Sequence, residues 1–231
     1  MPAEQKPEIA SVWTRPRRQR EQLSREQIVA EAVRLLDADG LEALSMRKLG
    51  TRLDAGATSL YRHVANKDEL IELVVDEVYG ELSVPIATGA AQWRDAAADS
   101  ARSLRAMILR HPWVASVLGQ VGLVHLGPNV TKMSERMAAV YRTAGFPAAE
   151  TELALSTVIS YVIGMATSEA AYLSLIARSG TTEREFAERL KGDGGSDARA
   201  DDPEQVREET FDYGLQRVLD GLQARLTSTA P

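Results

Sequence analysis

The residues with the clearest chemistry lie in one short stretch, between positions 44 and 67. Within it, the segment Thr58–His63 carries hydroxyl, guanidinium and imidazole groups that can bond to phosphates and to base edges. Only Leu60 and Val64, four residues apart, can form an apolar stripe on a helix here, so the polar side chains must lie off that stripe. A role in the core does not explain so many hydrogen-bonding groups on one short helix. The pattern predicts a surface that meets a polar partner.

Two short helices joined by a tight turn would position this segment. Ser45 is a good N-cap for the first helix, with Leu44 and Leu49 as its apolar staple, and the helix is expected to run to about Leu53. Asp54-Ala55-Gly56 follows, and both Asp and Gly tolerate the left-handed backbone of a turn. This layout is typical of a helix-turn-helix, in which one helix braces against the DNA backbone and the next lies in the major groove.

The helix-turn-helix hypothesis assigns a role to each polar side chain. Ser45 and Arg47 would hold a phosphate with the free amides of their helix, the alternative being simple capping and a surface charge. Arg62 is the best candidate for a bidentate contact with guanine. Tyr61 would pack its ring on the core while its hydroxyl reaches a phosphate. His63 is expected to donate to a phosphate, since no second His, Asp or Glu lies at metal spacing on that helix. The expected DNA contacts are Ser45, Arg47, Thr58, Ser59, Tyr61, Arg62, His63 and Lys67.

Two longer helices are predicted to enclose the motif. One occupies Ser24–Gly40, with Gln27 completing a capping box, and its apolar stripe has helical spacing. The other is capped by Asn66, with Glu69 as its box partner, and runs to about Leu82. The predicted core residues of these helices are Ile28, Ala32, Leu35, Leu36, Leu70, Val74 and Val78.

The net charge of −6 is distributed unevenly along the chain. Residues 1–67 carry 12 Lys and Arg against 9 Asp and Glu, a net charge of +3, whereas residues 68–231 carry 15 against 24, a net charge of −9. This asymmetry would orient the molecule on a phosphate backbone. Residues 1–22 are interpreted as a basic flexible arm because Arg15–Arg20 contains four arginines. Such an arm either follows the phosphates and enters the minor groove or is a solvated tail, and the sequence favours neither.

The composition excludes several classes of site. The chain has no cysteine, which rules out disulfides, thiolate zinc sites and a cysteine nucleophile. No run of about 18 apolar residues was found, so no membrane span is expected. The N-terminal residues lack the apolar stretch of a signal peptide, and a cytoplasmic location is expected. The sequence also predicts no cofactor.

Three runs together carry a resemblance to a known family. Leu60-Tyr61-Arg62-His63-Val64, then Asn66-Lys67-Asp68-Glu69-Leu70, after Ser45-Met46-Arg47-Lys48-Leu49, resemble the signature of the tetracycline-repressor (TetR) family of regulators, over residues 23–80. The chain departs from the family at Asp54, where members usually carry glycine. The resemblance implies an all-helical homodimer with an N-terminal DNA-reading domain and a C-terminal domain for ligand binding and dimerisation. It also implies that the helix holding Thr58–His63 reads DNA, with support from Arg47 and Lys67.

The remainder of the chain has only helical apolar spacing beyond Gly89, so the whole fold is predicted to be all-α. Helices are expected at 93–110, 113–118 and 128–144, and His111-Pro112 ends the first because the residue before proline avoids helical geometry. A long helix over 148–178 should be buried on all sides at its centre, Thr157–Ala166.

The last helix, over 203–226, and the long helix before it would form a four-helix bundle between two subunits. The alternative is an intramolecular packing face, and the family resemblance favours the dimer. Residues 179–202 show no convincing stripe and are predicted to form a mobile loop around Gly192–Gly195.

A ligand site is expected among the middle helices, because Met and aromatic side chains suit an apolar, adaptable cavity. Each of these side chains is more often ordinary core. The candidates are Met107, Trp113, Met133, Met137, Tyr141, Tyr161, Met165 and Tyr172.

His125 is a further ligand-site candidate. The run Val124–Gly127 resembles the loop that gives a histidine to the drug-bound magnesium ion in tetracycline repressors, and Glu169 could complete such a site. A loop histidine bonded to backbone is the interpretation we favour, so no metal ligand is assigned.

The leading hypothesis is a sequence-specific DNA-binding regulator, a repressor released from a palindromic operator by an apolar or aromatic small molecule. A homodimer would hold two reading helices ~34–36 Å apart, in successive major grooves. A helical enzyme is disfavoured because no nucleophile, phosphate loop or paired-carboxylate motif occurs. A non-specific architectural DNA binder would need a strongly basic chain, whereas the pI is 5.3. The predicted domains are the arm (1–22), the DNA-binding domain (23–82) and the ligand-binding and dimerisation domain (83–231).

Overall fold

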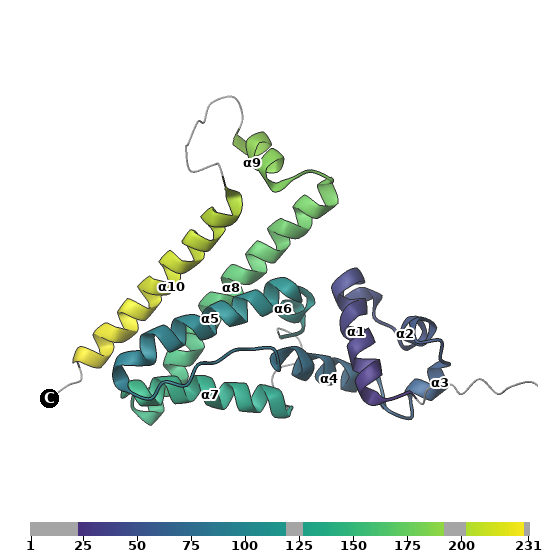
Figure 1. Cartoon of the computed structure of the whole chain (residues 1–231), viewed down its shortest axis with the longest axis horizontal. Coiled ribbons are helices and arrows are strands. Elements are labelled where there is room, and N and C mark those ends of the chain that lie inside the picture. Colours follow the sequence, from purple (N-terminus) through teal and green to yellow (C-terminus); the bar gives the residue numbers. More distant parts are fainter. Residues whose placement is uncertain (1–22, 119–126, 192–201, 229–231) are drawn as a thin grey trace, which may run out of the picture.

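The computed structural model describes residues 23–118, 127–191 and 202–228, which are helical and contain no strand (Figure 1). The all-α prediction is confirmed. The arginines of the arm, His125 and Gly192–Gly195 lie outside the described residues. The helices are α1 (Arg25–Asp39), α2 (Met46–Arg52), α3 (Ala57–Leu60), α4 (Lys67–Tyr79), α5 (Trp93–Arg110), α6 (Trp113–Leu118), α7 (Pro128–Ala144), α8 (Ala148–Ser179), α9 (Glu183–Lys191) and α10 (Pro203–Ser228), with 3-10 turns at Leu41–Ala43 and Ala90–Gln92.

The start of α1 follows the predicted capping box. The Gln27 amide donates to the Ser24 hydroxyl at 3.2 Å, and the Ser24 amide donates to the Gln27 side-chain oxygen at 3.0 Å. Two of the four free amides of the first turn are thus satisfied locally. The predicted stripe is buried, and Ile28, Ala32 and Leu35 have no exposed surface. The capping box fixes where α1 begins, and the buried stripe packs α1 against the core of the small N-terminal unit.

The turn between α2 and α3 is tighter than its sequence suggests. Asp54 has a φ of +46°, so an aspartate occupies the left-handed position, while Gly56 has a φ of −70°. The position that requires glycine is instead Gly50, where a Cβ would stand 2.7 Å from the Ala55 carbonyl oxygen and 3.5 Å from Cδ1 of Leu60. The turn therefore folds back onto α2 at a position where only glycine leaves enough space.

The segment Thr58–His63, called the reading segment from here on, is less regular than predicted. The α-helix ends at Leu60, and Tyr61–His63 continue as hydrogen-bonded turns. The amides of His63 and Val64 both donate to the Leu60 carbonyl, at 2.9 and 3.1 Å, which keeps the chain coiled. Leu60 and Val64 are 0% and 1% exposed, as their four-residue spacing predicts.

The start of α4 differs slightly from a capping box. The Asn66 side chain accepts from the Glu69 amide at 2.8 Å, but the Glu69 carboxylate accepts from the amide of Ala65 at 2.6 Å. The helix ends at Tyr79, before the predicted Leu82, and Leu70, Val74 and Val78 are fully buried along it.

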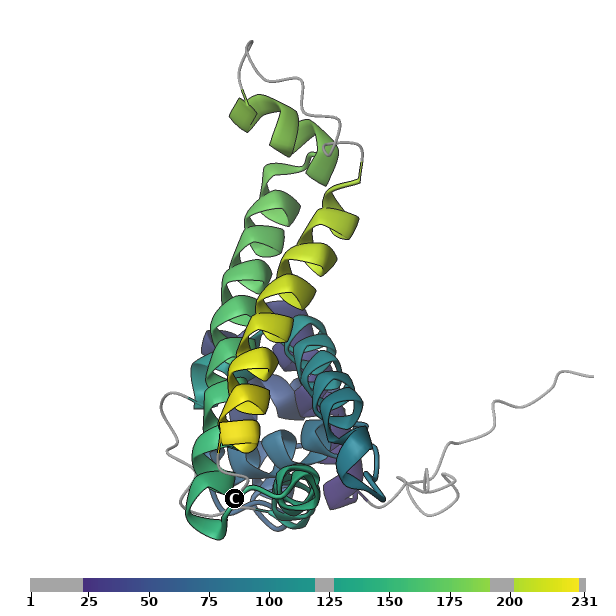
Figure 2. The same cartoon turned by 90° about the vertical axis from the view of Figure 1, so that its left-hand side faces the viewer.

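The larger C-terminal unit is built around α5, α7 and α8, with α10 packed beside α8 (Figures 1 and 2). Trp93 Nε1 donates to the Gln223 side chain at 3.1 Å, which joins α5 to α10. The Tyr161 hydroxyl donates to the Phe211 carbonyl at 2.8 Å, which joins α8 to α10. These polar contacts fix the lengthwise alignment of helices that pack through apolar surfaces.

The centre of α8 is not buried on all sides, contrary to the prediction. Val158, Val162 and Ala166 are buried, whereas Thr157, Ser160 and Gly164 are exposed. The reason is that α5, α7 and α10 cover only part of α8 within one chain. By length and composition alone, α8 could also cross a membrane, with a mean hydropathy of 1.3 over its most apolar stretch, although it contains no unbroken run of about 18 apolar residues.

The expected loop at 179–202 contains a helix, α9. Its first turn is fixed by a capping box that sequence reading missed: the Glu185 amide donates to the Thr182 hydroxyl at 3.2 Å, and the Thr182 amide donates to the Glu185 carboxylate at 2.8 Å. The Phe186 ring contacts that of Tyr172, with centroids 5.9 Å apart. The mobile-loop prediction is therefore wrong for 183–191.

We expect Gly50→Ala to destabilise the DNA-binding unit by about 1–3 kcal/mol, because the added methyl meets a backbone carbonyl that cannot move away. Urea unfolding monitored by circular dichroism measures the change. Gly56→Ala is the matched control, since no atom of the described residues lies within 4 Å of its Cβ position. Equal stability of the two variants would contradict the close packing of the turn on α2.

Candidate nucleic-acid interface and ligand cavity

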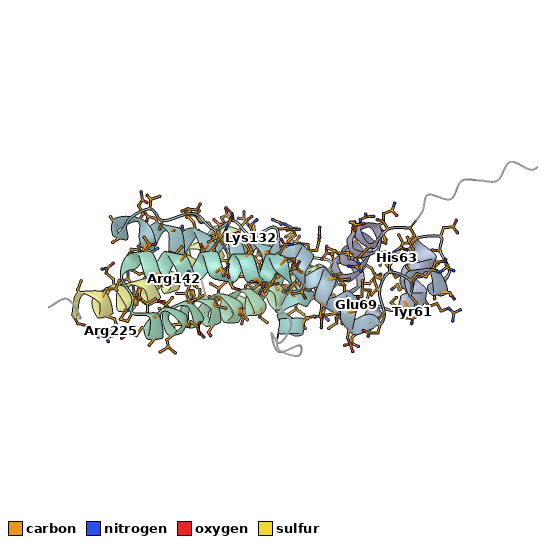
Figure 3. All side chains as sticks on the ribbon, turned by 90° about the horizontal axis from the view of Figure 1, so that it is seen from below. Tyr61, His63, Glu69, Lys132, Arg142 and Arg225 are labelled. Carbon is orange, nitrogen blue, oxygen red and sulfur yellow. The ribbon has the colours of Figure 1, made fainter. Side chains whose placement is uncertain are left out.

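The polar flank of the reading segment lies on the surface. Thr58, Ser59 and Arg62 are exposed, and His63 is half-buried. Tyr61 is 52% exposed, so its ring does not pack on the core, contrary to the expectation. Figure 3 places Tyr61 and His63 at the end of the molecule away from Arg225 of α10. Because Leu60 and Val64 hold the opposite side of the segment inside, its hydrogen-bonding groups project outward together.

The Lys and Arg residues of the N-terminal unit fall into two groups, those that form ion pairs and those that do not. Residues 23–82 carry 7 Lys and Arg against 12 Asp and Glu, so this unit is acidic overall. Lys48 lies 3.0 Å from Asp39, Arg52 lies 3.5 Å from Glu31, and Arg34 is also paired with Glu31. Within the described residues, no ion pair engages the other four cations of the unit. These are Arg25, Arg47, Arg62 and Lys67.

Three of the four unpaired cations are expected DNA contacts, and all four are exposed. Arg47 stands in the first turn of α2, where the Ser45 hydroxyl accepts from the Lys48 amide at 3.2 Å. Lys67 is the first residue of α4. Free amides and an unpaired cation at a helix start are the usual elements of a phosphate site.

Arg25 was missed by sequence reading. It is the first residue of α1, directly after the Ser24 cap, so its position at a capped helix start was the signal available.

An open groove of about 1150 Å³ runs between α1 and the α2–α3 turn. Ser59, Arg62 and His63 line it from one side, and Glu26 and Glu31 line it from α1. The pKa of Glu26 lies below its ordinary value, chiefly through a backbone hydrogen bond and the Ser24 hydroxyl, with smaller contributions from Arg25 and His63. The carboxylates of Glu26 and Glu31 would repel phosphate from the groove. The side of the reading segment that faces away from the groove is therefore the surface suited to DNA.

A small apolar cavity lies in the C-terminal unit, between α5, α7 and α8. Its volume is about 10 Å³, roughly the space that one water molecule needs. Met137 and Tyr141 line it, together with Leu104, Leu155 and Val158. The Tyr141 side chain is 2% exposed, and burial raises its pKa. The Tyr141 hydroxyl forms no hydrogen bond with the described residues.

The structure does not gather the other expected ligand residues around this cavity. Trp113 Nε1 donates to Asp37 at 2.8 Å, and the Tyr161 ring packs on Phe211 at 5.6 Å. Neither Trp113 nor Tyr161 lines the cavity, and each has a partner elsewhere in the fold. Met107 and Met133 are core residues, and Met165 and Tyr172 are half-buried away from the cavity lining.

Comparison with known proteins agrees with this arrangement of a helix-turn-helix unit and a helical unit. The model "Bacterial regulatory proteins, tetR family" matches residues 28–74, and the model "Tetracyclin repressor-like, C-terminal domain" matches residues 84–226. The chain belongs to the TetR family. It is a DNA-binding transcriptional regulator.

Relatives of this TetR-family chain include regulators from two actinomycetes. An HTH-type transcriptional regulator of Saccharopolyspora erythraea is 41% identical over 165 residues, which span 70% of this chain and 69% of the relative. The transcriptional repressor DrrR1 of Streptomyces coeruleorubidus is 34% identical over 87% of this chain and 77% of its own length. The crystal structure of apo ActR from Streptomyces coelicolor aligns with a TM-score of 0.70 at 30% identity, covering 91% of this chain and 99% of ActR.

Glu169 is not available to complete a metal site in this TetR-family chain. Its carboxylate accepts from Arg105 Nε at 2.8 Å, from Arg105 Nη2 at 2.7 Å and from Arg207 Nε at 2.9 Å. Arg207 also pairs with Glu183. The described residues contain no group of three His, Cys, Asp or Glu side chains placed to hold a metal ion.

We expect Arg62→Ala and Lys67→Ala to weaken operator binding in different ways. Loss of a base contact by Arg62→Ala should relax specificity at one base pair by ~1–3 kcal/mol, whereas Lys67→Ala should weaken all duplexes alike and lower the salt slope by about one. Fluorescence anisotropy at two salt concentrations separates these effects. Arg34→Ala, which removes a paired cation of the same unit, is the matched control. Unchanged affinity of Arg62→Ala at fixed salt would contradict the assignment.

We expect the Glu169 cluster to stabilise the fold in a pH-dependent way. Burial acts to raise the pKa of Glu169, but hydrogen bonds from Arg105 and Arg207 outweigh it, and the net pKa is lowered. A lowered folded pKa contributes stability that is complete above the unfolded value of about 4.3 and is lost as pH falls through the folded value.

The stability lost in Glu169→Gln should therefore be larger at pH 6 than at pH 3, as measured by urea unfolding. Glu135→Gln is the control, since the Glu135 carboxylate is exposed and forms no ion pair within the described residues. A pH-independent difference between wild type and Glu169→Gln would refute this contribution.

Proposed function

We propose that the chain is a repressor that binds a palindromic operator as a homodimer and is released by a small apolar molecule. The observation that carries the proposal is that Arg47, Arg62 and Lys67, in the unit that contains α3, are exposed and form no ion pair within the described residues. In an acidic unit, cations left free on one surface supply the phosphate contacts that position a reading helix. BioQ, which aligns with a TM-score of 0.62 at 28% identity over 88% of this chain and 99% of its own, has been solved with its double-stranded DNA operator.

The expected DNA contacts are proposed residue by residue. Ser45, Arg47 and Lys67 contact phosphates from helix starts, and Tyr61 and His63 reach the backbone from the end of the reading segment. Thr58, Ser59 and Arg62 face base edges, with Arg62 on a guanine. Arg25 adds a phosphate contact from α1. The role is binding rather than catalysis, carried out in the cytoplasm.

The exposed sides of α8 and α10 support the homodimer. Leu153 and Leu175 on α8 are 67% and 47% exposed, and Tyr213 on α10 is 68% exposed. Between these two leucines, exposed positions of α8 carry small residues such as Ser160, Gly164 and Thr167, which lets another helix approach closely. A four-helix bundle would bury this surface and hold two reading segments at a fixed spacing. The composition that makes α8 apolar enough for a membrane is then explained by burial on both sides.

The cavity between α5, α7 and α8 is proposed as the ligand site. Its lining is apolar except for the hydroxyls of Ser100 and Tyr141, and Ser100 already donates to the Ala96 carbonyl at 2.7 Å. Tyr141 therefore offers the free donor, and an apolar or aromatic molecule with one acceptor fits the chemistry. ActR, a 29% identical neighbour with a TM-score of 0.67, has been solved with actinorhodin.

Selection of duplexes from a random pool, followed by footprinting on DNA flanking the chain's own gene, tests the proposal. We expect a palindrome with half-site centres ~10 base pairs apart, preferred ~10³-fold or more over random DNA. Sedimentation should show a dimer on one duplex. Equal affinity for selected and random duplexes would instead favour the architectural alternative.

A further inference from the structure

Helix α4 is hydrogen-bonded to the start of α7 through one side chain. Asp76 Oδ1 accepts from the amides of Asn129 at 2.8 Å and Val130 at 3.0 Å. The Asn129 side chain donates back to the Asp76 carbonyl oxygen at 3.1 Å. The first amides of α7, which lack partners within their own helix, are thus capped by a carboxylate from the DNA-binding unit.

The chain is adapted to this contact at Gly127. A Cβ at this position would lie 2.3 Å from Asp76 Oδ1 and 2.8 Å from Asp76 Cβ. Any side chain here would push Asp76 out of the helix start. The residue that precedes α7 therefore permits the close approach of α4.

A second contact holds the DNA-binding unit at the α5–α6 corner. Asp37 of α1 accepts from Trp113 Nε1 at 2.8 Å and lies 2.7 Å from His111 Nδ1. The other ring nitrogen of His111 lies 3.3 Å from Glu81, and the His111 side chain is 4% exposed. This corner joins α1 and the end of α4 to the C-terminal unit independently of α7.

Helix α7 connects the cavity to Asp76 directly. Met137, Val140 and Tyr141 line the cavity, and Asn129 lies eight residues before Met137 on the same helix, ~12 Å along its axis. The opposite side of α7 faces solvent, where Lys132 and Arg142 project (Figure 3). The far side of α8 would be covered in the proposed dimer, so we expect α7 to be the cavity wall that moves outward when the cavity takes up a molecule.

We propose that Asp76 is the positioning residue that transmits the state of the cavity to the reading segment. Outward movement of α7 draws its N-terminal amides away from Asp76, while the Asp37 corner stays in place and acts as the pivot. Because α4 begins at Lys67, directly after the reading segment, its rotation changes the spacing between the two reading segments of a dimer. This inference rests on the proposed function and assigns its coupling to one carboxylate.

Coupling is reciprocal, so bound DNA must change the affinity of the cavity for a ligand by the same factor as the ligand changes the affinity for DNA. The chain has no cysteine, and Leu155→Cys places a single thiol in the cavity wall. The probe is the rate at which 5,5′-dithiobis(2-nitrobenzoate) labels this thiol, with and without the duplex selected by the wild-type chain. We expect the duplex to slow labelling about fivefold or more.

The double variant Leu155→Cys, Asp76→Ala should still bind the duplex, but its labelling rate should be the same with and without the duplex. Gly127→Ala should have the same effect, since it displaces Asp76 from the other side, and it serves as the test if Asp76→Ala fails to fold. Glu72→Ala removes an exposed acid of α4 that has no ion pair within the described residues, and it should keep the full DNA dependence.

Two outcomes overturn the inference while leaving the proposed function intact. One is a duplex-dependent labelling rate that survives both Asp76→Ala and Gly127→Ala. The other is a Leu155→Cys chain, otherwise wild-type, that binds the selected duplex without any change in its labelling rate. If the wild-type chain selects no duplex at all, the proposed function fails, and the inference that rests on it fails with it.

Discussion

The burial of Leu60 and Val64 is the constraint on which the DNA-binding surface depends. Both side chains are almost completely buried, although α3 has only one regular turn and ends at Leu60. Leu60 fits against α2 where Gly50 leaves room, and this contact sets the rotation of the whole segment. A different rotation would turn Arg62 and Ser59 inward and expose two apolar side chains. The hydrophobic effect thus determines which side chains meet DNA, although it contributes nothing to the contacts themselves.

Electrostatics then selects which cations remain free. The N-terminal unit is acidic, and its carboxylates engage Lys48, Arg52 and Arg34 at the side of α1. Surface pairs of this kind contribute little to stability. Their larger effect is to leave positive charge at the helix starts of α2 and α4 and at the end of the reading segment. Carboxylates also join the two units, since Asp37 and Asp76 each accept hydrogen bonds from the C-terminal unit.

Local signals in the sequence predicted local structure well. The Ser24 box, the Ser45 and Asn66 caps and the buried stripes all depend on neighbours within one or two turns, so single-sequence reasoning reaches them. The Thr182 capping box was equally local and was overlooked. What sequence could not supply was the partner of each side chain across the fold: Asp37 for Trp113, Phe211 for Tyr161, and two arginines for Glu169. The exposed side of α8 was also misjudged, because an apolar helix looks alike whether its own chain or a second chain covers it.

The chain has no cysteine, so a single introduced thiol can test most directly whether the reading segment faces DNA. An iron–EDTA reagent attached to Ser59→Cys generates hydroxyl radicals that cut only the DNA beside the attachment point. We expect cuts within both half-sites of the selected operator, their centres ~10 base pairs apart and symmetric on the two strands. The same reagent on the exposed Thr131→Cys of α7 should produce none. Bound operator left uncut by the Ser59→Cys conjugate would contradict the account.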